Sequence, residues 1–543
     1  VEKGYVSQQE AKKVKEEAAK RQTEMDQYKA EAEQYKAELD QVKADMADLK
    51  AKGGIYQTNM PSSMPETKWL IGKGVTSVEL FGDARVRYEA RTAKDPSGRK
   101  IDLNRERYAL RFGVKGEALQ GVYYGMRLET SANPRSTWVS MGSSSSLSAY
   151  QGPYGKSSAT IDVGQAYLGW QPDSWIDITA GKMPNPLYTT SLVWDGDINP
   201  EGLAERFKYT VGEADFFANF GQFVYADLNP NQASGGLGFN GINGQGTGNI
   251  FMFAWQGGLT YHITPNVSAK FAATIYNYVG LQPSSVNAGS TTSPYFGNPY
   301  VGEGAYYLFG GPGSGYAPGY GGYSPGTAGG AANYSLPGYG SVSYPFNQVG
   351  LNNLLVLEFP FELNIKLNKL AIRPFGDFAY NLNGSERAQE AASAYSYIMA
   401  NPPPGLIPAS HSFSAQTHDV KAYQIGIGIG STNFVSSPTK GVVNGNSGGK
   451  NAWELRTYWQ HIEQYSLDPN LIDSDFFEGR ENMEGIYIAL GYAFTPNLVG
   501  TVRYGYATRI NDKLGTGGSN QDIPQMNPID KYRLFQVDLG VRF

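Results

Sequence analysis

The sequence predicts an all-β transmembrane antiparallel barrel of about sixteen strands, with eighteen as the alternative, preceded by an N-terminal α-helical coiled coil. Three observations predict it. A heptad repeat runs through residues 25–50, apolar and polar residues alternate with period two in the rest of the chain, and the connections between the alternating segments are short and long in turn. The chain accordingly divides into a coiled coil at 1–52, a linker at 53–74 and a barrel at 75–543.

The heptad repeat has a seam of apolar and aromatic residues separated by alternating steps of three and four. Its a and d positions are Met25, Tyr28, Ala32, Tyr35, Leu39, Val42, Met46 and Leu49. The e positions are lysines and the g positions are Glu31, Glu38 and Asp45, so parallel copies in register place each carboxylate opposite a lysine. A narrow a/d stripe buries little surface unless helices associate, so we expect this segment to join copies of the chain. A lone amphipathic or solvated helix is the alternative.

The barrel segments alternate between an apolar face and a face of small, polar or charged residues. Near the C-terminus, Phe535, Val537 and Leu539 alternate with Gln536 and Asp538. In an outer-membrane barrel the apolar face meets lipid and the polar face lines a lumen, whereas a soluble sandwich would bury the apolar face. We therefore expect replacements of Gln536 and Asp538 to be milder than an arginine at Leu539.

Loop lengths distinguish the barrel from the sandwich. Connections after even-numbered segments are mostly tight, such as EALQG, QPDSW and VGEAD, and those after odd-numbered segments are long, such as 131–160 and 280–346. One even connection, 431–450, is long and breaks the rule. Short periplasmic turns and long external loops are typical of bacterial barrels, and an even strand number places both termini, and with them the helix, in the periplasm. The segments are centred near residues 83, 109, 125, 165, 178, 207, 221, 256, 272, 356, 375, 426, 457, 489, 503 and 538.

Composition excludes several classes of function. The net charge is −5 without a clustered basic surface, which argues against nucleic acid as a partner. There is no cysteine, so disulfides and thiolate metal sites are excluded. The four histidines are scattered and no nucleophile–base pair or phosphate-binding motif is present, so we expect neither enzyme activity nor a cofactor.

An alternating strand that ends in Phe543, in a chain of about sixteen strands, resembles the Gram-negative general porins. The heptad segment ahead of the barrel resembles that of coiled-coil-bearing porins, including those of Geobacter-type bacteria. The resemblance covers about residues 75–543 by pattern and implies a homotrimer in the cell outer membrane, surrounded by lipid and lipopolysaccharide. It also implies that the loop after the fifth strand, here 184–202 (PNPLYTTSLVWDGDINPEG), folds into the lumen. The long external loops and the added helix depart from the family, so pore size does not carry over.

The inward loop and the first three strands supply a candidate pore constriction. The loop carries three carboxylates and a fourth follows it, whereas five arginines lie opposite the lipid-facing residues of the strands. The candidates are Asp195, Asp197, Glu201 and Glu205, with Arg85, Arg87, Arg107, Arg111 and Arg127. Carboxylates that face guanidinium groups across a narrow gap create a field that favours hydrophilic solutes over apolar ones. Solvated lumen charges, with the loop pointing outward, are the alternative.

A second acidic cluster, Asp473, Asp475 and Glu478, lies in an expected external loop and is a weak candidate for calcium, with solvated loop charge as the plainer interpretation. Residues 195–199 also begin like a calcium loop, but the glutamate expected at the twelfth position is missing.

Three functions compete at this level. The first is passive diffusion of small hydrophilic solutes and ions through the barrel. The second is a structural tether between the outer membrane and the peptidoglycan of the cell wall, through the helix. The third is a barrel that surrounds an electron-transfer partner.

A peptide of residues 1–52 should be helical and should associate in parallel. We expect three strands, mainly from the resemblance to porins, because methionine, alanine and leucine at a with tyrosine at d do not fix the number. Analytical ultracentrifugation measures the assembly. A peptide that stays monomeric at high concentration would contradict the coiled coil.

Overall fold

The computed structural model describes residues 74–96, 98–131, 136–142, 160–226, 250–279, 353–389, 392, 415–432, 434–437, 441–447, 449–516, 522–523 and 528–543. The predicted coiled coil and all but the last residue of the predicted linker lie outside these residues. Across the described ranges, no helix has both the length and the apolar character needed to cross a membrane.

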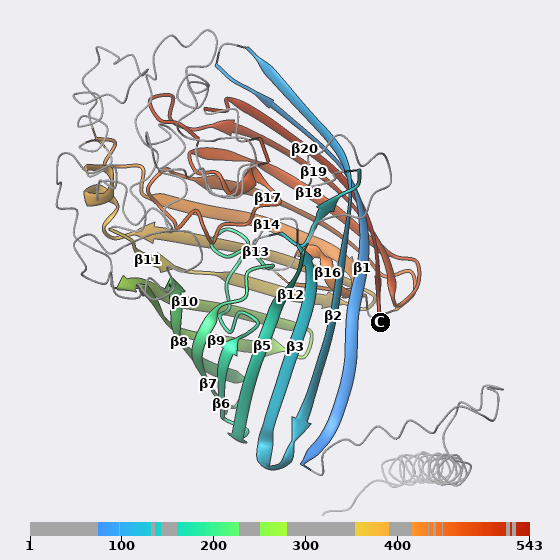
Figure 1. The fold of residues 1–543 in the computed structure, drawn as a ribbon. Coiled ribbons are helices and arrows are strands. Elements are labelled where there is room, and N and C mark those ends of the chain that lie inside the picture. Colours follow the sequence, from blue (N-terminus) through green and yellow to red (C-terminus); the bar gives the residue numbers. More distant parts are fainter. Residues whose placement is uncertain are drawn as a thin grey trace, which may run out of the picture. The chain divides into compact units, whose positions relative to one another are not determined.

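Sixteen strands form the wall of a closed antiparallel barrel (Figure 1). The sheet contains eighteen strand segments, of which the short β4 (Val139–Ser140) only flanks β2, and β11 and β12 together make one wall strand because both pair with β10 and β13. The wall consists of β1 (Val75–Lys94), β2 (Lys100–Ala118), β3 (Val122–Ser131), β5 (Thr160–Asp173), β6 (Ile176–Lys182), β7 (Glu201–Val211), β8 (Ala214–Ala226), β9 (Ile250–Thr264), β10 (Val267–Val279), β11 (Leu355–Glu358) with β12 (Phe361–Leu367), β13 (Leu370–Asn381), β14 (Lys421–Ser431), β17 (Trp453–Ile462), β18 (Met483–Ala493), β19 (Leu498–Arg509) and β20 (Lys531–Arg542).

The barrel closes where β1 pairs with β20, from Asp83 opposite Arg542 to Lys94 opposite Lys531. Figure 1 shows the blue first strand running beside the red last strands. Closure gives the backbone N–H and C=O groups of both edge strands hydrogen-bond partners. A membrane requires this because its hydrocarbon interior contains no water to bind these groups. Every predicted segment centre falls within one wall strand, so the prediction of a sixteen-strand barrel is confirmed.

The wall is apolar outside and polar inside, as the alternation predicts. On β20, Val537 and Leu539 are 40% and 43% exposed, whereas Gln536 and Asp538 are 0% and 3% exposed. The same parity holds on β18, where Ile488 and Leu490 are exposed and Ala489 is buried. A soluble protein has the opposite arrangement, so the outer face of this chain suits lipid rather than water.

The connections sort by length between the two ends of the barrel. One end, here called the short-turn end, has tight turns at 119–121, 174–175, 212–213, 265–266, 368–369 and 494–497. The other end has the long connections, apart from the tight turn at 95–99. The connection that broke the pattern in the sequence contains a separate hairpin of β15 (Phe434–Ser437) and β16 (Gly441–Ser447), which accounts for its length.

Replacing Leu539 by Arg should destabilise the inserted barrel, by roughly 2–4 kcal/mol if the site is near the bilayer midplane and by less near the rim. Urea unfolding from lipid vesicles measures the free energy. The control is Leu539→Ala, which shortens the side chain without adding charge and should cost less. If both substitutions cost the same, Leu539 does not face lipid.

Candidate functional site

Two long connections, 183–200 and 463–482, are bound to the inner face of the wall. The first joins β6 to β7 and is the loop that the resemblance to porins implies, whereas the second joins β17 to β18. Residues 464–482 are buried except for 473–475, which are half-buried. Connections buried this deeply need partners for their backbone polar groups, and the inner wall provides them. We name these segments the first and second inward loops.

One end of the first inward loop is held by the wall at β9 and β11. The side chain of Gln256 accepts a hydrogen bond from the Tyr188 amide at 2.8 Å and donates one to the Tyr188 carbonyl oxygen at 2.7 Å. The Thr189 hydroxyl donates to Glu358 on β11. These bonds explain why polar residues occupy buried wall positions here, since each satisfies a group of the loop.

The other end of the same loop is held at β2 and β5. Arg111 donates to Asp197 Oδ1 at 2.5 Å, and Gln165 Nε2 donates to Asn199 Oδ1 at 2.9 Å. Between the two ends, Trp194 is 2% exposed and donates its indole N–H to the Ile198 carbonyl oxygen. The loop thus runs across the lumen from one side of the wall to the other, around a small apolar centre of its own.

The second inward loop is joined directly to the first. The Asp195 amide donates to the Leu471 carbonyl oxygen at 2.6 Å, and Asp195 Oδ2 accepts from the amide and hydroxyl of Ser474 at 3.2 and 3.0 Å. The sequence reasoning missed this loop and assigned it to the exterior. The apolar content of this loop could have predicted its inward position, because large apolar side chains are unfavourable in a loop exposed to water. Leu467, Phe476 and Phe477 are all buried in the structure.

The five candidate arginines share the inner face of β1, β2 and β3: Arg85, Arg87, Arg107, Arg111 and Arg127. Acidic side chains of the wall and loops pair with most of them. Arg85 lies 2.8 Å from Asp83, and Arg127 lies 3.0 Å from Glu129. The indole ring of Trp138 covers Arg85 and Arg87, whose guanidinium carbons lie 4.8 and 4.1 Å from the ring centre. The wall is therefore a network of fixed ion pairs and not a row of unopposed positive charges.

Asp538 of β20 joins two arginines of this network. Arg87 donates to both its oxygens at 2.7 and 2.9 Å, and Arg503 of β19, which the sequence reasoning did not single out, also donates to it. Removing this carboxylate would leave two buried guanidinium groups without their partner, which is costly. Replacing Asp538 is thus expected to be severe, contrary to the prediction from alternation alone.

Asp195 and Asp197 differ in charge near neutral pH. Burial, and then the neighbouring charge of Asp197, raises the pKa of Asp195 to about 7. Burial opposes the ionisation of Asp197 as well, but Arg111 and Arg85 outweigh it and hold the pKa of Asp197 below its usual range. Below pH 7 this pair therefore carries one fixed negative charge, on Asp197.

Glu201 and Glu205 do not lie in the lumen. They share the outward parity of β7 with Tyr209, opposite to the buried inward Ala204. Glu201 pairs with Lys182 at 2.5 Å on the outer face, and Glu205 accepts from Gln222 Nε2 at 3.0 Å on the same face. Their inclusion in the predicted constriction was wrong, because the period-two backbone turns these residues away from the lumen.

The weak calcium candidates have separate partners. Asp475 pairs with Arg87 at 2.9 Å and Glu478 with Arg480 at 3.1 Å, while the carboxylate of Asp473 accepts from the Asp475 amide at 3.3 Å. In the part of the chain that the structure describes, no group of three or more carboxylate or imidazole side chains is arranged to hold a metal ion.

A family model described as "Putative porin" matches residues 93–295, less than half of the chain, from the end of β1 into the connection after β10. The resemblance to porins predicted from the sequence is thereby confirmed, and the finer resemblance to those of Geobacter-type bacteria stays a prediction. None of the curated proteins matches the sequence.

Solved structures match most of the chain at low identity. OprB of Pseudomonas putida at high pH is 10% identical, with 86% of this chain and 94% of that one covered and a TM-score of 0.42. An anion-selective porin from Comamonas acidovorans is 9% identical (86% and 99% covered, TM-score 0.36), and the outer-membrane OmpT of Vibrio cholerae is 8% identical (86% and 97% covered, TM-score 0.33). The assignment of the fold rests instead on the strand pairing described above.

The stability of the folded chain should fall as the pH rises from about 4 to about 7, because of Asp195. Its pKa rises from an ordinary 3.8 to about 7 on folding, so the folded chain binds more protons in this interval and each increase in pH favours unfolding. The full effect is at most about 4 kcal/mol. Urea unfolding at a series of pH values measures it.

The matched variant is Asp195→Asn, which cannot ionise and should make the decline shallower. Burial also raises the pKa of Asp473, which acts in the same direction, so part of the slope remains. Equal slopes in the variant and the parent would assign the decline to other groups.

Proposed function

We propose that this chain forms an outer-membrane channel for the passive diffusion of small hydrophilic solutes and ions, with no enzymatic step. Its closed barrel, apolar outside and polar inside, and the match of residues 93–295 to a porin family support this function. Sixteen-strand barrels are wide enough for an aqueous channel. The short-turn end then faces the periplasm and the long connections face the outside.

The constriction of this channel consists of the two inward loops and the arginine wall. The single observation that carries the proposal is the ion pair between Asp197 of the first inward loop and Arg111 of the wall at 2.5 Å. Asp475 of the second inward loop, paired with Arg87, adds a further carboxylate to the same wall. Solutes that pass between loops and wall meet closely spaced opposite charges, which favour polar molecules over apolar ones. The constriction residues are Asp195, Asp197 and Asp475 with Arg85, Arg87, Arg107, Arg111 and Arg127.

The functional unit is a homo-oligomer, and we propose a trimer joined in the periplasm by the coiled coil at 25–50. The ion pair between Lys182 and Glu201 and the bond between Glu205 and Gln222 lie on the outer face of neighbouring strands. Charges at lipid-facing positions are unfavourable, and contact with a second copy would cover them. Lipid and lipopolysaccharide surround the remaining outer face, and the helix extends toward the peptidoglycan.

Replacing Asp197 by Asn should shift ion permeation toward chloride. The substitution removes the ionised carboxylate that neutralises Arg111, and low-dielectric walls amplify the resulting positive potential. We expect the chloride-to-potassium permeability ratio to rise about twofold or more, most clearly at low salt, where screening is weakest. Reversal potentials across planar bilayers in a potassium chloride gradient give the ratio.

The matched control is Glu201→Gln, which removes the same charge from the outer face and should leave the reversal potential unchanged. At pH 6, Asp195→Asn should also change the reversal potential little, because the Asp195 side chain is already mostly neutral. At pH 8 the same substitution should change the reversal potential more. An unchanged reversal potential in Asp197→Asn would place the first inward loop outside the conduction path.

A further inference from the structure

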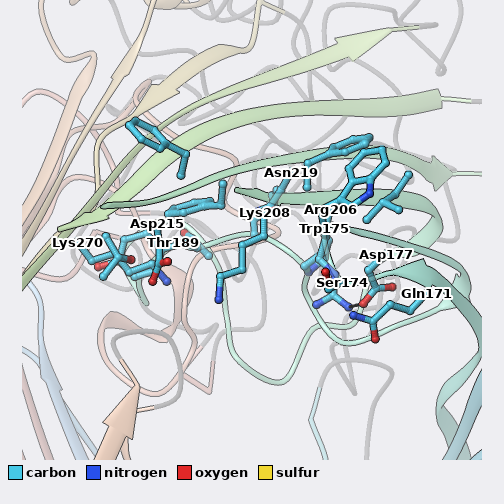
Figure 2. A pocket seen from close by; sticks show the side chains of 18 of the residues that line it. Gln171, Ser174, Trp175, Asp177, Thr189, Arg206, Lys208, Asp215, Asn219 and Lys270 are labelled. Carbon is cyan, nitrogen blue, oxygen red and sulfur yellow. Dashed lines mark hydrogen bonds and ion pairs between the residues drawn. The ribbon is translucent and has the colours of Figure 1, made fainter. Parts of the chain in front are cut away.

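A pocket of about 600 Å³ lies at the short-turn end of the barrel, beside residues 186–189 of the first inward loop. Its walls come from the turn between β5 and β6 and from β7, β8, β10 and β12 (Figure 2). The end of the first inward loop that Gln256 holds is part of this pocket, whereas the end at Asp197 is not, so the pocket is distinct from the charged pair at Arg111. None of the constriction residues lines it.

The pocket contains an ammonium group that the wall leaves open to a ligand. Lys208 points into the space between the groups of side chains in Figure 2, and it forms no ion pair with any described residue. The nearby acids are engaged elsewhere. Asp177 pairs with Arg206 at 2.5 Å, and Asp215 is hydrogen-bonded to Thr210 at 2.5 Å and to His262 at 3.1 Å, although the charge of Lys208 also acts on it. Lys208 is therefore available to bind an anion.

A second ammonium group is held in place by aromatic rings. The Lys270 nitrogen lies 4.0 Å from the ring centre of Tyr188 and 5.1 Å from that of Phe217. Glu362, opposite Lys270 on β12, also lines the pocket and offsets one of the two lysine charges. Arg206 balances Asp177, while Asp215 and Glu362 balance the two lysine charges, so the attraction for an anion comes from the exposed ammonium group of Lys208, and a singly charged ligand disturbs this balance least.

The aromatic part of the pocket is pre-organised. Gln256 bonds both the amide and the carbonyl oxygen of Tyr188, which fixes the ring beside Lys270. The Tyr188 hydroxyl is buried and has no hydrogen-bond partner among the described residues, so an added acceptor would satisfy it. A site whose groups are fixed in advance loses less entropy when a ligand binds.

We propose that this pocket binds small aromatic monocarboxylates, with the carboxylate at Lys208 and Lys270 and the ring against Phe217 and Tyr188. The inference rests on the proposed channel, whose periplasmic entrance the pocket would form. A carboxylate gains charge-assisted hydrogen bonds from the two ammonium groups, and the aromatic ring leaves water for an apolar wall. The site would thereby favour such anions over acetate or chloride, which lack a ring.

Calorimetric titration of the purified full chain in detergent with benzoate tests the pocket without relying on conduction. We expect saturable binding with one site per chain, and weaker binding of acetate. Lys208→Gln should weaken benzoate binding about tenfold or more, because it removes one charged contact. Lys208 is exposed and makes no ion pair within the described ranges, so this change should not disturb folding, and Lys208→Arg should retain binding.

The control variant is Lys366→Gln, which removes a lysine from the short-turn end of β12 outside the pocket and should leave the affinity unchanged. Unsaturable benzoate binding, or equal affinity in Lys208→Gln and the parent, would overturn the pocket. Conductance steps measured on the same preparation report separately on the channel. Conductance steps without benzoate binding would reject the proposed binding site but support the proposed channel. Benzoate binding without conductance steps would support the binding site but reject the channel.

Discussion

The pairing of β1 with β20 is the constraint on which the rest of this structure depends. Closure removes both sheet edges and turns alternate residues toward a single enclosed interior. Apolar side chains of the wall such as Phe223, Phe375 and Tyr458 fill only part of that interior, because many of the apolar residues face outward. Polar and charged residues consequently line the inside, where each one needs a partner. The ion-pair network and the two inward loops are the consequences of that need.

The inward loops act as an inner layer that satisfies the wall while supplying apolar groups of its own. Trp194 of the first loop packs near Phe223, and Phe476 of the second packs against Tyr458 and Tyr487. Loop backbone and hydroxyl groups pair with wall side chains such as Gln256, and without these bonds the buried polar groups of the loop would lose their partners. Wall and loops are therefore interdependent, since each leaves unpaired polar groups if the other is removed.

The sequence predicted what depends on local periodicity and missed what depends on the shape of the interior. Period-two alternation predicted the position of every wall strand, because alternate residues of each strand face the lipid and the interior of the closed barrel. The same alternation also predicts that Glu205 faces outward, because it has the parity of Phe207 and Tyr209 on the lipid face. The prediction instead followed the acidic loop just before Glu205 and assigned it to the lumen. The second inward loop could not be placed from periodicity, because irregular backbone has none. Its contact with Asp195 joins residues 279 positions apart in the chain.

The way the two loops are joined also determines how such a channel can be controlled. Asp195 is bound through both its backbone and its side chain to the second loop, whose Asp475 is bound to Arg87 of β1. The first loop is in turn held at β2, through Asp197, and at β9. Neither loop can swing away without breaking buried charged contacts, and breaking such contacts one partner at a time is expensive. Discrimination between solutes in this lumen would therefore arise from fixed charges rather than from loop opening. The ionisation of Asp195, at the junction of the two loops, is the step by which a rise in pH through about 7 can weaken their contact.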